Sequence, residues 1–177
     1  MNWTPALKKH GHVLLAFLAG AAWLLGVVAV FLPWYGWSTA VFGVQLSANG
    51  LSSSMTVGAG PTNTVGWAPL NLLFIIGIVL GGVGCYQAIP WGAAGGQGPS
   101  RWARLLLAGS VLELLGVIGY VLAASSAIAA KGASPFFAVQ GGAILAIVTS
   151  LVAAGLTGWD LGWDRVIAQR TSYAPPT

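Results

Sequence analysis

Residues 13–32 read VLLAFLAGAAWLLGVVAVFL, an uncharged run that ends at Pro33 and Trp34. About 20 apolar residues suffice for an α-helix to cross the roughly 30 Å of bilayer hydrocarbon. A segment in hydrocarbon must satisfy its own backbone hydrogen bonds, so it has to be helical. The run is too long for the apolar region of a secretory signal, and no small-residue cleavage site follows it. We therefore predict a retained transmembrane span over residues 13–32.

Three further apolar stretches are long enough to cross a bilayer. They cover about residues 69–89, 103–127 and 136–158. Pro69 suits a first helical position, and Pro90 is predicted to stop the second span. Ser100 suits the N-cap of the third span. Sequence therefore predicts a single all-α membrane domain over residues 1–177, built as a bundle of four transmembrane helices.

Composition agrees with a membrane protein, because 56% of the residues are hydrophobic and only 6% are charged. A soluble domain carries about 25% charged residues. The basic residues are spread along the chain instead of forming a patch, so no nucleic-acid partner is expected. Abundant Gly and Ala with scarce Lys indicate a bacterial genome of high GC content. We therefore predict a multi-pass protein of the bacterial cytoplasmic membrane.

The basic residues also predict the orientation of the spans. Six of the seven lie before the first span, between the second and third, or after the fourth: Lys8, Lys9, Arg101, Arg104, Arg165 and Arg170. Only Lys131 falls on the opposite side. Cytoplasmic loops are enriched in Lys and Arg, so both termini are predicted to be cytoplasmic.

Seven tryptophans are placed by this topology at the ends of the spans, where aromatic residues anchor helices at the membrane surface. Trp34, Trp37 and Trp67 fall at outer ends, and Trp91, Trp102, Trp159 and Trp163 at inner ends. Membrane lipids are accordingly an expected partner of the chain.

The outer loop, residues 35–68, contains no charged residue. Within it, Asn49 and Gly50 form the dipeptide most typical of a type I′ hairpin turn. A two-residue turn there would place Val44 opposite Met55 and give one apolar and one polar face. The alternative is an irregular loop rich in Gly, Ser and Thr. We predict an extracytoplasmic β-hairpin between the first and second helices, supported on the helix ends or on a partner.

A first span that ends in Leu32-Pro33-Trp34-Tyr35, a β-rich outer loop and three further spans resemble uncharacterised bacterial four-span membrane proteins. The layout is also similar to that of claudin-like tetraspan proteins. The claudin loop carries a pair of cysteines, however, whereas this loop has none. The resemblance implies the four-span layout and no particular activity.

Small residues recur on three of the predicted helices, where they let helix backbones approach closely. The fourth span carries a stripe at four-residue spacing: Gly142, Ala146, Ser150, Ala154 and Gly158. The second span offers Gly77 and Gly81, and the third offers Gly109 and Gly116. Such faces can pack within the bundle, which we favour, or against another protein.

Glu113 is the one charged side chain inside a predicted span, and Gly109, Gly116 and Tyr120 share its helical face. It lies nine residues after Arg104, about 13 Å along the helix. An intramembrane acid is a functional candidate as a proton relay, an ion site or a contact with a partner. The alternative is a neutral acid that hydrogen-bonds within the bundle, and the lack of a second intramembrane acid favours this structural role.

Gly-Trp-Asp occurs twice near the end of the fourth span, with aspartates at Asp160 and Asp164. These carboxylates could hold a cation or pair with Arg101 and Arg104, and we favour the ion pairs because two carboxylates make a poor metal site. His10 and His12 are interpreted as headgroup anchors in place of metal ligands. Cys85, the single cysteine, is interpreted as an inert packing residue.

No catalytic set, metal-ligand cluster or phosphate-binding loop is recognised, so neither an enzyme nor a cofactor is predicted. Two functions remain. The first is an accessory or structural subunit of a larger membrane protein complex. The second is a small oligomeric proton-coupled transporter that uses Glu113. Small multidrug-resistance transporters also have four spans and an intramembrane Glu, but their acid lies in the first span and their loops are short.

Overall fold

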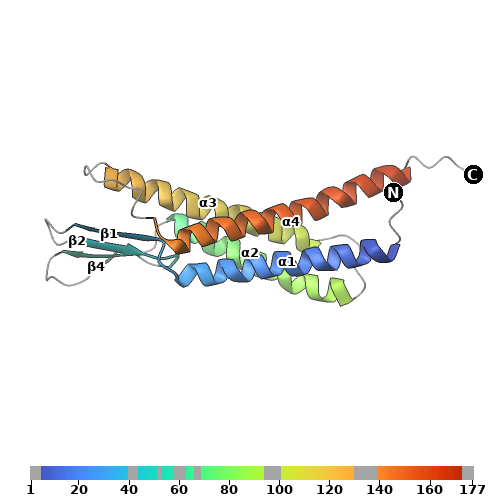
Figure 1. The fold of residues 1–177 in the computed structure, drawn as a ribbon, viewed down its shortest axis with the longest axis horizontal. Coiled ribbons are helices and arrows are strands. Elements are labelled where there is room, and N and C mark those ends of the chain that lie inside the picture. Colours follow the sequence, from blue (N-terminus) through green and yellow to red (C-terminus); the bar gives the residue numbers. More distant parts are fainter. Residues whose placement is uncertain are drawn as a thin grey trace, which may run out of the picture.

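The computed structural model describes residues 5–39, 44–51, 53–57, 63–65, 69–93, 101–129 and 139–172. It is a long bundle of four helices with a small sheet at one end (Figure 1). The elements follow in the order α1 (Pro5–Phe31), β1 (Tyr35–Thr39), β2 (Val44–Ala48), β3 (Ser53–Val57), β4 (Asn63–Val65), α2 (Pro69–Ala93), α3 (Arg101–Ala129) and α4 (Gly141–Ser172). We call the two ends of the bundle the sheet end and the termini end, since α1 begins and α4 ends at the same end.

All four helices are long and apolar enough to cross a membrane, which confirms the predicted fold class. The apolar segments are Gly11–Phe31, Leu70–Gly92, Arg101–Ser126 and Gly141–Gly162. Large apolar side chains cover the outside of the bundle, as lipid contact requires. Phe17 on α1 is 72% exposed and Leu122 on α3 is 65% exposed. The chain is therefore a multi-pass membrane protein.

Two predicted helix ends are wrong. α2 continues through Pro90 to Ala93, because a proline one turn from the end removes only a single backbone hydrogen bond. α4 begins at Gly141 instead of residue 136, because Val139 forms a β-bridge with Tyr35. Ser100, the predicted N-cap of the third span, lies outside the described residues.

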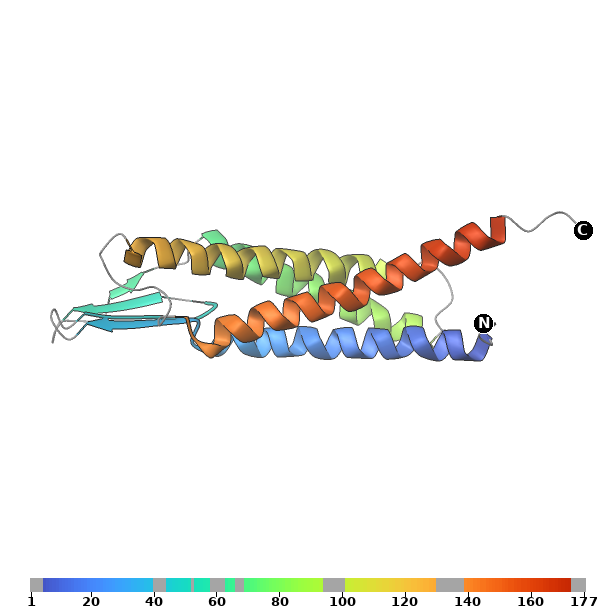
Figure 2. The same ribbon diagram turned by 45° about the horizontal axis from the view of Figure 1, so that its top comes forward.

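The helices form a closed arrangement in which α3 packs extensively on α2 and also on α4, while α4 packs on α1 (Figure 2). α1 and α2 contact each other much less than these three pairs do. The weak α1–α2 seam is the only loose one among neighbouring helices of the described chain. This seam opens at the termini end.

Glycines bring α2 and α3 into backbone contact. A β-carbon added at Gly77 would lie 2.6 Å from the carbonyl oxygen of Gly109, and one added at Gly109 would lie 2.6 Å from the carbonyl oxygen of Gly77. Towards the sheet end, a β-carbon at Gly116 would lie 2.7 Å from the backbone nitrogen of Phe74. These distances are too short for any side chain, so glycine alone permits the contact. Gly81 on α2 accommodates the ring of Trp23 from α1.

On α4, the small residues at four-residue spacing leave the packed face as the helix proceeds. Gly142, Ala146 and Ser150 are buried, whereas Ala154 is half-buried and Gly158 has nothing within 4 Å of an added β-carbon. Four residues turn an α-helix by about 400°, so the stripe drifts by about 40° at each step. Gly158 thus lies about 160° around the helix from Gly142. The buried face continues through Ala153, Thr157 and Asp160 instead.

The sheet confirms the predicted hairpin and extends it. Its four antiparallel strands follow the order β1-β2-β3-β4. The predicted register is wrong by two residues, because Val44 lies opposite Val57 and not Met55. A shift of two leaves every side chain on its predicted face, since strand side chains alternate with a period of two. The β1 and β4 strands were not predicted.

The turn between β2 and β3 explains the register. It is longer than two residues, and the side chain of Asn49 accepts a hydrogen bond of 2.9 Å from the backbone nitrogen of Leu51. Gly50 does not have the positive φ that a type I′ turn requires. Instead, its backbone nitrogen donates to the carbonyl oxygen of Val30 at 2.9 Å. Gly50 is needed for close approach to the end of α1, where an added β-carbon would lie 3.0 Å from the α-carbon of Val30.

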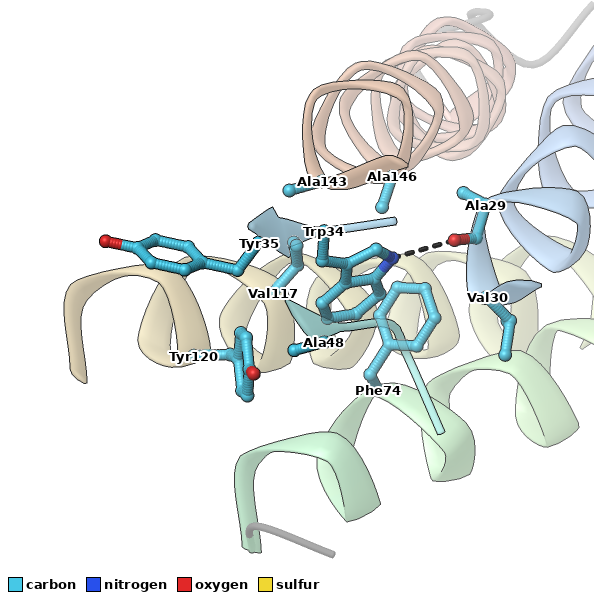
Figure 3. Packing of buried hydrophobic residues seen from close by; sticks show 10 residues of the cluster. All are labelled: Ala29, Val30, Trp34, Tyr35, Ala48, Phe74, Val117, Tyr120, Ala143 and Ala146. Atoms are coloured by element: carbon cyan, nitrogen blue, oxygen red, sulfur yellow. Dashed lines mark hydrogen bonds between the residues drawn. The ribbon is translucent and has the colours of Figure 1, made fainter. Parts of the chain in front are cut away.

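A buried cluster joins the sheet to the helices at this end (Figure 3). Trp34 is fully buried at its centre, and its indole nitrogen donates to the carbonyl oxygen of Ala29 at 2.7 Å. Its ring meets Phe74 edge-on at a centroid distance of 4.7 Å and Tyr120 at 5.7 Å. Trp34 is therefore a core residue, and the prediction that it anchors the membrane surface is wrong. The sequence places it one residue after Pro33, where the chain turns inward from α1 to the sheet.

The α2–α3 contact can be tested with a single methyl group. We expect Gly77→Ala to lower the thermal stability of the full chain in detergent, because the new β-carbon meets backbone atoms of α3 that cannot move aside. The matched control is Gly155→Ala on α4, where nothing lies within 4 Å. Alanine has the higher helix propensity, by about 1 kcal/mol, so the control should be neutral or stabilising. Equal effects of the two substitutions would contradict the glycine contact.

Candidate functional site

A buried carboxyl group lies where all four helices meet. Glu113 on α3 is 1% exposed, and its Oε2 accepts a hydrogen bond of 3.1 Å from the hydroxyl of Ser150 on α4. From α1, a β-carbon added at Gly26 would lie 3.4 Å from the same oxygen. From α2, one added at Gly77 would lie 2.7 Å from the γ-carbon of Glu113. Two glycines thus make room for the carboxyl group.

Ser150 differs from the other buried hydroxyls of the bundle. Ser110, Thr149 and Thr157 each donate to a carbonyl oxygen in their own helix, as isolated hydroxyls in helices commonly do. Ser150 donates across the bundle to Glu113. This is a direct polar link between α3 and α4. Interhelical hydrogen bonds of this kind stabilise membrane bundles.

The second carboxyl oxygen of Glu113, Oε1, is buried without a hydrogen-bond partner in the described structure. An unpaired charged oxygen in an apolar interior is costly, which favours the neutral acid. A neutral carboxylic acid can also donate a hydrogen bond. The arrangement therefore suits either a structural acid or a site that takes up and releases a proton. Tyr120, predicted to share this face, lies two turns towards the sheet end in the Trp34 cluster.

A second polar contact lies near the termini end. His12 on α1 and the fully buried Asp160 on α4 are joined by a contact of 2.5 Å between Nδ1 and Oδ1. The His12 ring meets Trp91 on α2 edge-on at 6.3 Å. The predicted role of His12 as a headgroup anchor is therefore wrong. Asp160 pairs with His12, while the predicted partners Arg101 and Arg104 have exposed side chains.

The remaining predicted anchors behave differently from one another. Trp159 is 67% exposed on α4, whereas Trp102 is 1% exposed and packs beside Trp91 at a centroid distance of 5.5 Å. The surface-anchor prediction is therefore wrong for Trp102. The side chains of three further predicted anchors lie outside the part of the chain that the structure describes: Trp37, Trp67 and Trp163. The same holds for Asp164 and His10. Sequence reasoning missed Trp23, which lies in the middle of the first predicted span. It also missed Asn71, whose side-chain amide donates to the carbonyl oxygens of Asn49 and Gly50 at 3.4 and 3.3 Å.

Within the residues described, no group of three or more His, Cys, Asp or Glu side chains is placed to hold a metal ion. Cys85 is half-buried on α2 and faces α1, where its sulfur lies 3.8 Å from a β-carbon added at Gly20. Comparison with protein-family models and with curated proteins finds no match for this chain.

Substitution of Glu113 separates its structural role from a chemical one. We expect Glu113→Gln to keep the bundle folded, because the amide can still accept from Ser150. Glu113→Leu should lower the free energy of unfolding by about 1–3 kcal/mol, because the polar link between α3 and α4 is lost. The measurement is thermal unfolding of both variants in the same detergent. A Gln variant as unstable as the Leu variant would contradict the hydrogen-bond role.

The His12–Asp160 contact can be measured as a coupling energy. We expect His12→Ala and Asp160→Asn to be non-additive by at least about 0.5 kcal/mol in a double-mutant cycle, because the two side chains are in direct contact. His10→Ala, two residues earlier in α1, is the control and should be additive with Asp160→Asn. Additivity in both cycles would show that the contact contributes nothing to stability.

Proposed function

We propose that the protein is an accessory or structural subunit of a larger membrane protein complex. The observation that carries the proposal is an open small-residue face on α4. An added β-carbon meets nothing within 4 Å at Gly155, Gly158 or Gly162. Their positions fall within a sector of about 60° on the helix. Small residues in a membrane helix allow a second helix to approach closely.

The other glycine faces of the bundle are already occupied. Gly77 and Gly109 contact each other, and Gly142 lies against the backbone of Pro33. The open α4 face differs because it is bordered by the exposed Trp159 and Leu151. Large side chains beside a small-residue groove suit interdigitation with a partner helix. Towards its end, α4 diverges from the other helices (Figure 2), which leaves this face accessible.

The proposed setting is the bacterial cytoplasmic membrane, with the termini end on the cytoplasmic side. Support comes from the basic residues, which flank the spans at that end. The proposed subunit has no enzyme activity and no cofactor of its own. Other membrane subunits and lipids are its proposed partners.

A second candidate is a small proton-coupled transporter in which Glu113 carries the proton. One observation favours it, namely that Oε1 of Glu113 is buried without a hydrogen-bond partner. Such an oxygen can carry a proton. In that case Glu113→Gln would abolish transport while leaving the fold intact, because an amide cannot carry the proton.

Photocrosslinking from the native membrane tests the subunit proposal. A photoreactive side chain at Gly158 should link to one defined membrane protein, whereas the same group at the exposed Val79 on α2 should link to lipid. Gly155→Leu should reduce the protein crosslink at position 158, because it fills the open face. Gly141→Leu is the matched control, since it also meets open space but lies at the sheet end. Lipid crosslinks alone at position 158 would contradict the proposal.

A further inference from the structure

An apolar groove of about 540 Å³ opens between α1 and α2 at the termini end. Its walls come from residues 13–24 of α1 and the last half of α2, and α3 forms its floor. The floor residues Trp102 and Leu106 are each 1% exposed. The rim residues Phe17 and Ile89 are 72% and 70% exposed. The groove therefore opens sideways from the bundle.

Trp23 keeps the groove open. Its indole nitrogen on α1 donates to the carbonyl oxygen of Ile78 on α2 at 3.0 Å. Its ring lies over Gly81 and Gly82, where added β-carbons would meet ring atoms at 2.5 and 3.0 Å. The bulk of a tryptophan side chain thus separates the two helices at mid-bundle. Beyond it, towards the termini end, the space between α1 and α2 is filled by neither helix.

The lateral opening lies within the membrane-spanning segments. Val13 and Leu24 line the groove on α1, inside the apolar segment Gly11–Phe31, and Ile89 lines it on α2. Hydrocarbon is therefore the medium that faces the opening. The side chains that line the groove lack dispersion contacts on their open side, and an acyl chain in the groove would supply them.

The groove is not apolar throughout, because it holds two unpaired hydrogen-bond donors at the end nearest the termini. The indole nitrogens of Trp91 and Trp102 are buried and have no acceptor in the described structure. Both rings line the groove. Buried indole N–H groups usually find a partner, and leaving one unpaired is costly. Both nitrogens are covered by neighbouring protein atoms, so a small rotation of each ring would bring its N–H group to an acceptor oxygen supplied by an occupant of the groove.

The charge around this end favours an anion. Arg101 and Arg104 flank Trp102 on α3 and have exposed side chains. The acidic side chains that the structure describes, Glu113 and Asp160, are both buried. The surface beside the groove is thus positive. Basic pockets between membrane helices bind anionic lipid headgroups.

We propose that this groove is a binding site for one anionic phospholipid from the leaflet at the termini end. An acyl chain lies along the apolar walls between Trp23 and the termini end. Ester or phosphate oxygens accept hydrogen bonds from Trp91 and Trp102, and the headgroup charge is met by Arg101 and Arg104. The site is independent of the proposed subunit function, since it uses the α1–α2 seam and not the open face of α4.

A lipid suits the groove better than a partner helix. The backbone carbonyls of a transmembrane helix are already hydrogen-bonded within that helix, so they are poor acceptors for the two indoles. Ester and phosphate oxygens of a lipid are free acceptors. A helix would leave both N–H groups unpaired unless it placed a polar side chain at the same depth.

The test uses the full chain in detergent, titrated with phosphatidylglycerol or phosphatidylcholine, with bound lipid counted by native mass spectrometry. We expect phosphatidylglycerol to bind at one site with the higher affinity. Gly20→Phe should abolish that binding, because the added β-carbon is tolerated at 3.8 Å from Cys85 while the ring fills the groove. Ala21→Phe fills the same groove, and it replaces Gly20→Phe in the binding measurement if that variant does not fold. Gly141→Phe is the matched control and should bind as the native chain does.

The headgroup contact is tested separately. Trp91→Phe and Trp102→Phe keep the aromatic ring and remove the donor, so each should weaken phosphatidylglycerol binding by about 2- to 10-fold. Trp159→Phe, on the exposed side of α4, should change nothing. Equal binding of the two lipids, or full binding by both groove-filling variants, would overturn the site. A photoreactive group at Phe17 that links to a protein in place of lipid would also overturn it.

Discussion

The bundle depends on the backbone contact between α2 and α3 at Gly77 and Gly109. In water, helices associate because their apolar faces leave the solvent, but lipid tails are as apolar as leucine and give no such drive. Association in the bilayer must come from close packing and interhelical polar contacts. The glycine contact supplies the first of these and brings α3 close enough for its other groups to meet α4. The exposed leucines and valines of the same helices contribute lipid contact only.

The position of Glu113 follows from this contact. Gly77 leaves space beside the γ-carbon of Glu113, and Gly26 leaves space beside its Oε2. A β-carbon at Gly77 would clash with Glu113, whereas one at Gly26 would make an ordinary contact with Oε2. The polar link between α3 and α4 thus depends on a glycine of α2, a helix that does not take part in it. Asp160 is a second buried acid within an apolar segment, Gly141–Gly162 of α4, and it pairs with His12 instead.

Sequence predicted the spans well because length and apolarity alone decide whether a segment can cross the bilayer. The finer features depended on tertiary contacts that no local pattern encodes. The dipeptide Asn-Gly predicts a type I′ turn at Gly50, but the chain uses Gly50 to approach Val30, and the hairpin register differs by two residues. The four-residue spacing on α4 predicts one continuous stripe, although the 3.6-residue helical repeat turns it away from the packed face.

The tryptophans show most clearly where sequence reasoning ends. Seven of the nine stand near predicted span ends, which suggests a single role as surface anchors. In the structure, Trp34 is a core residue, Trp23 separates two helices, and Trp102 forms the floor of a groove. The amphipathic ring suits all of these environments. Which one applies depends on what the neighbouring helix presents, whether glycines, a carbonyl oxygen or lipid.

The two polar contacts of the interior bear on the choice between a subunit and a transporter. Ser150, beside Glu113, and Asp160, beside His12, are ten residues apart on α4, or about 15 Å along the helix axis. Between them the packed face carries Ala153 and Thr157, and the hydroxyl of Thr157 is bonded back to the carbonyl oxygen of Ala153 at 2.7 Å. A proton moving from Glu113 to the termini end would have to cross this stretch, which offers one hydroxyl already engaged. A transporter would need a rearrangement of α4 to bridge the gap. A subunit held together by two separate polar contacts needs none, and the described structure therefore favours the structural role for Glu113.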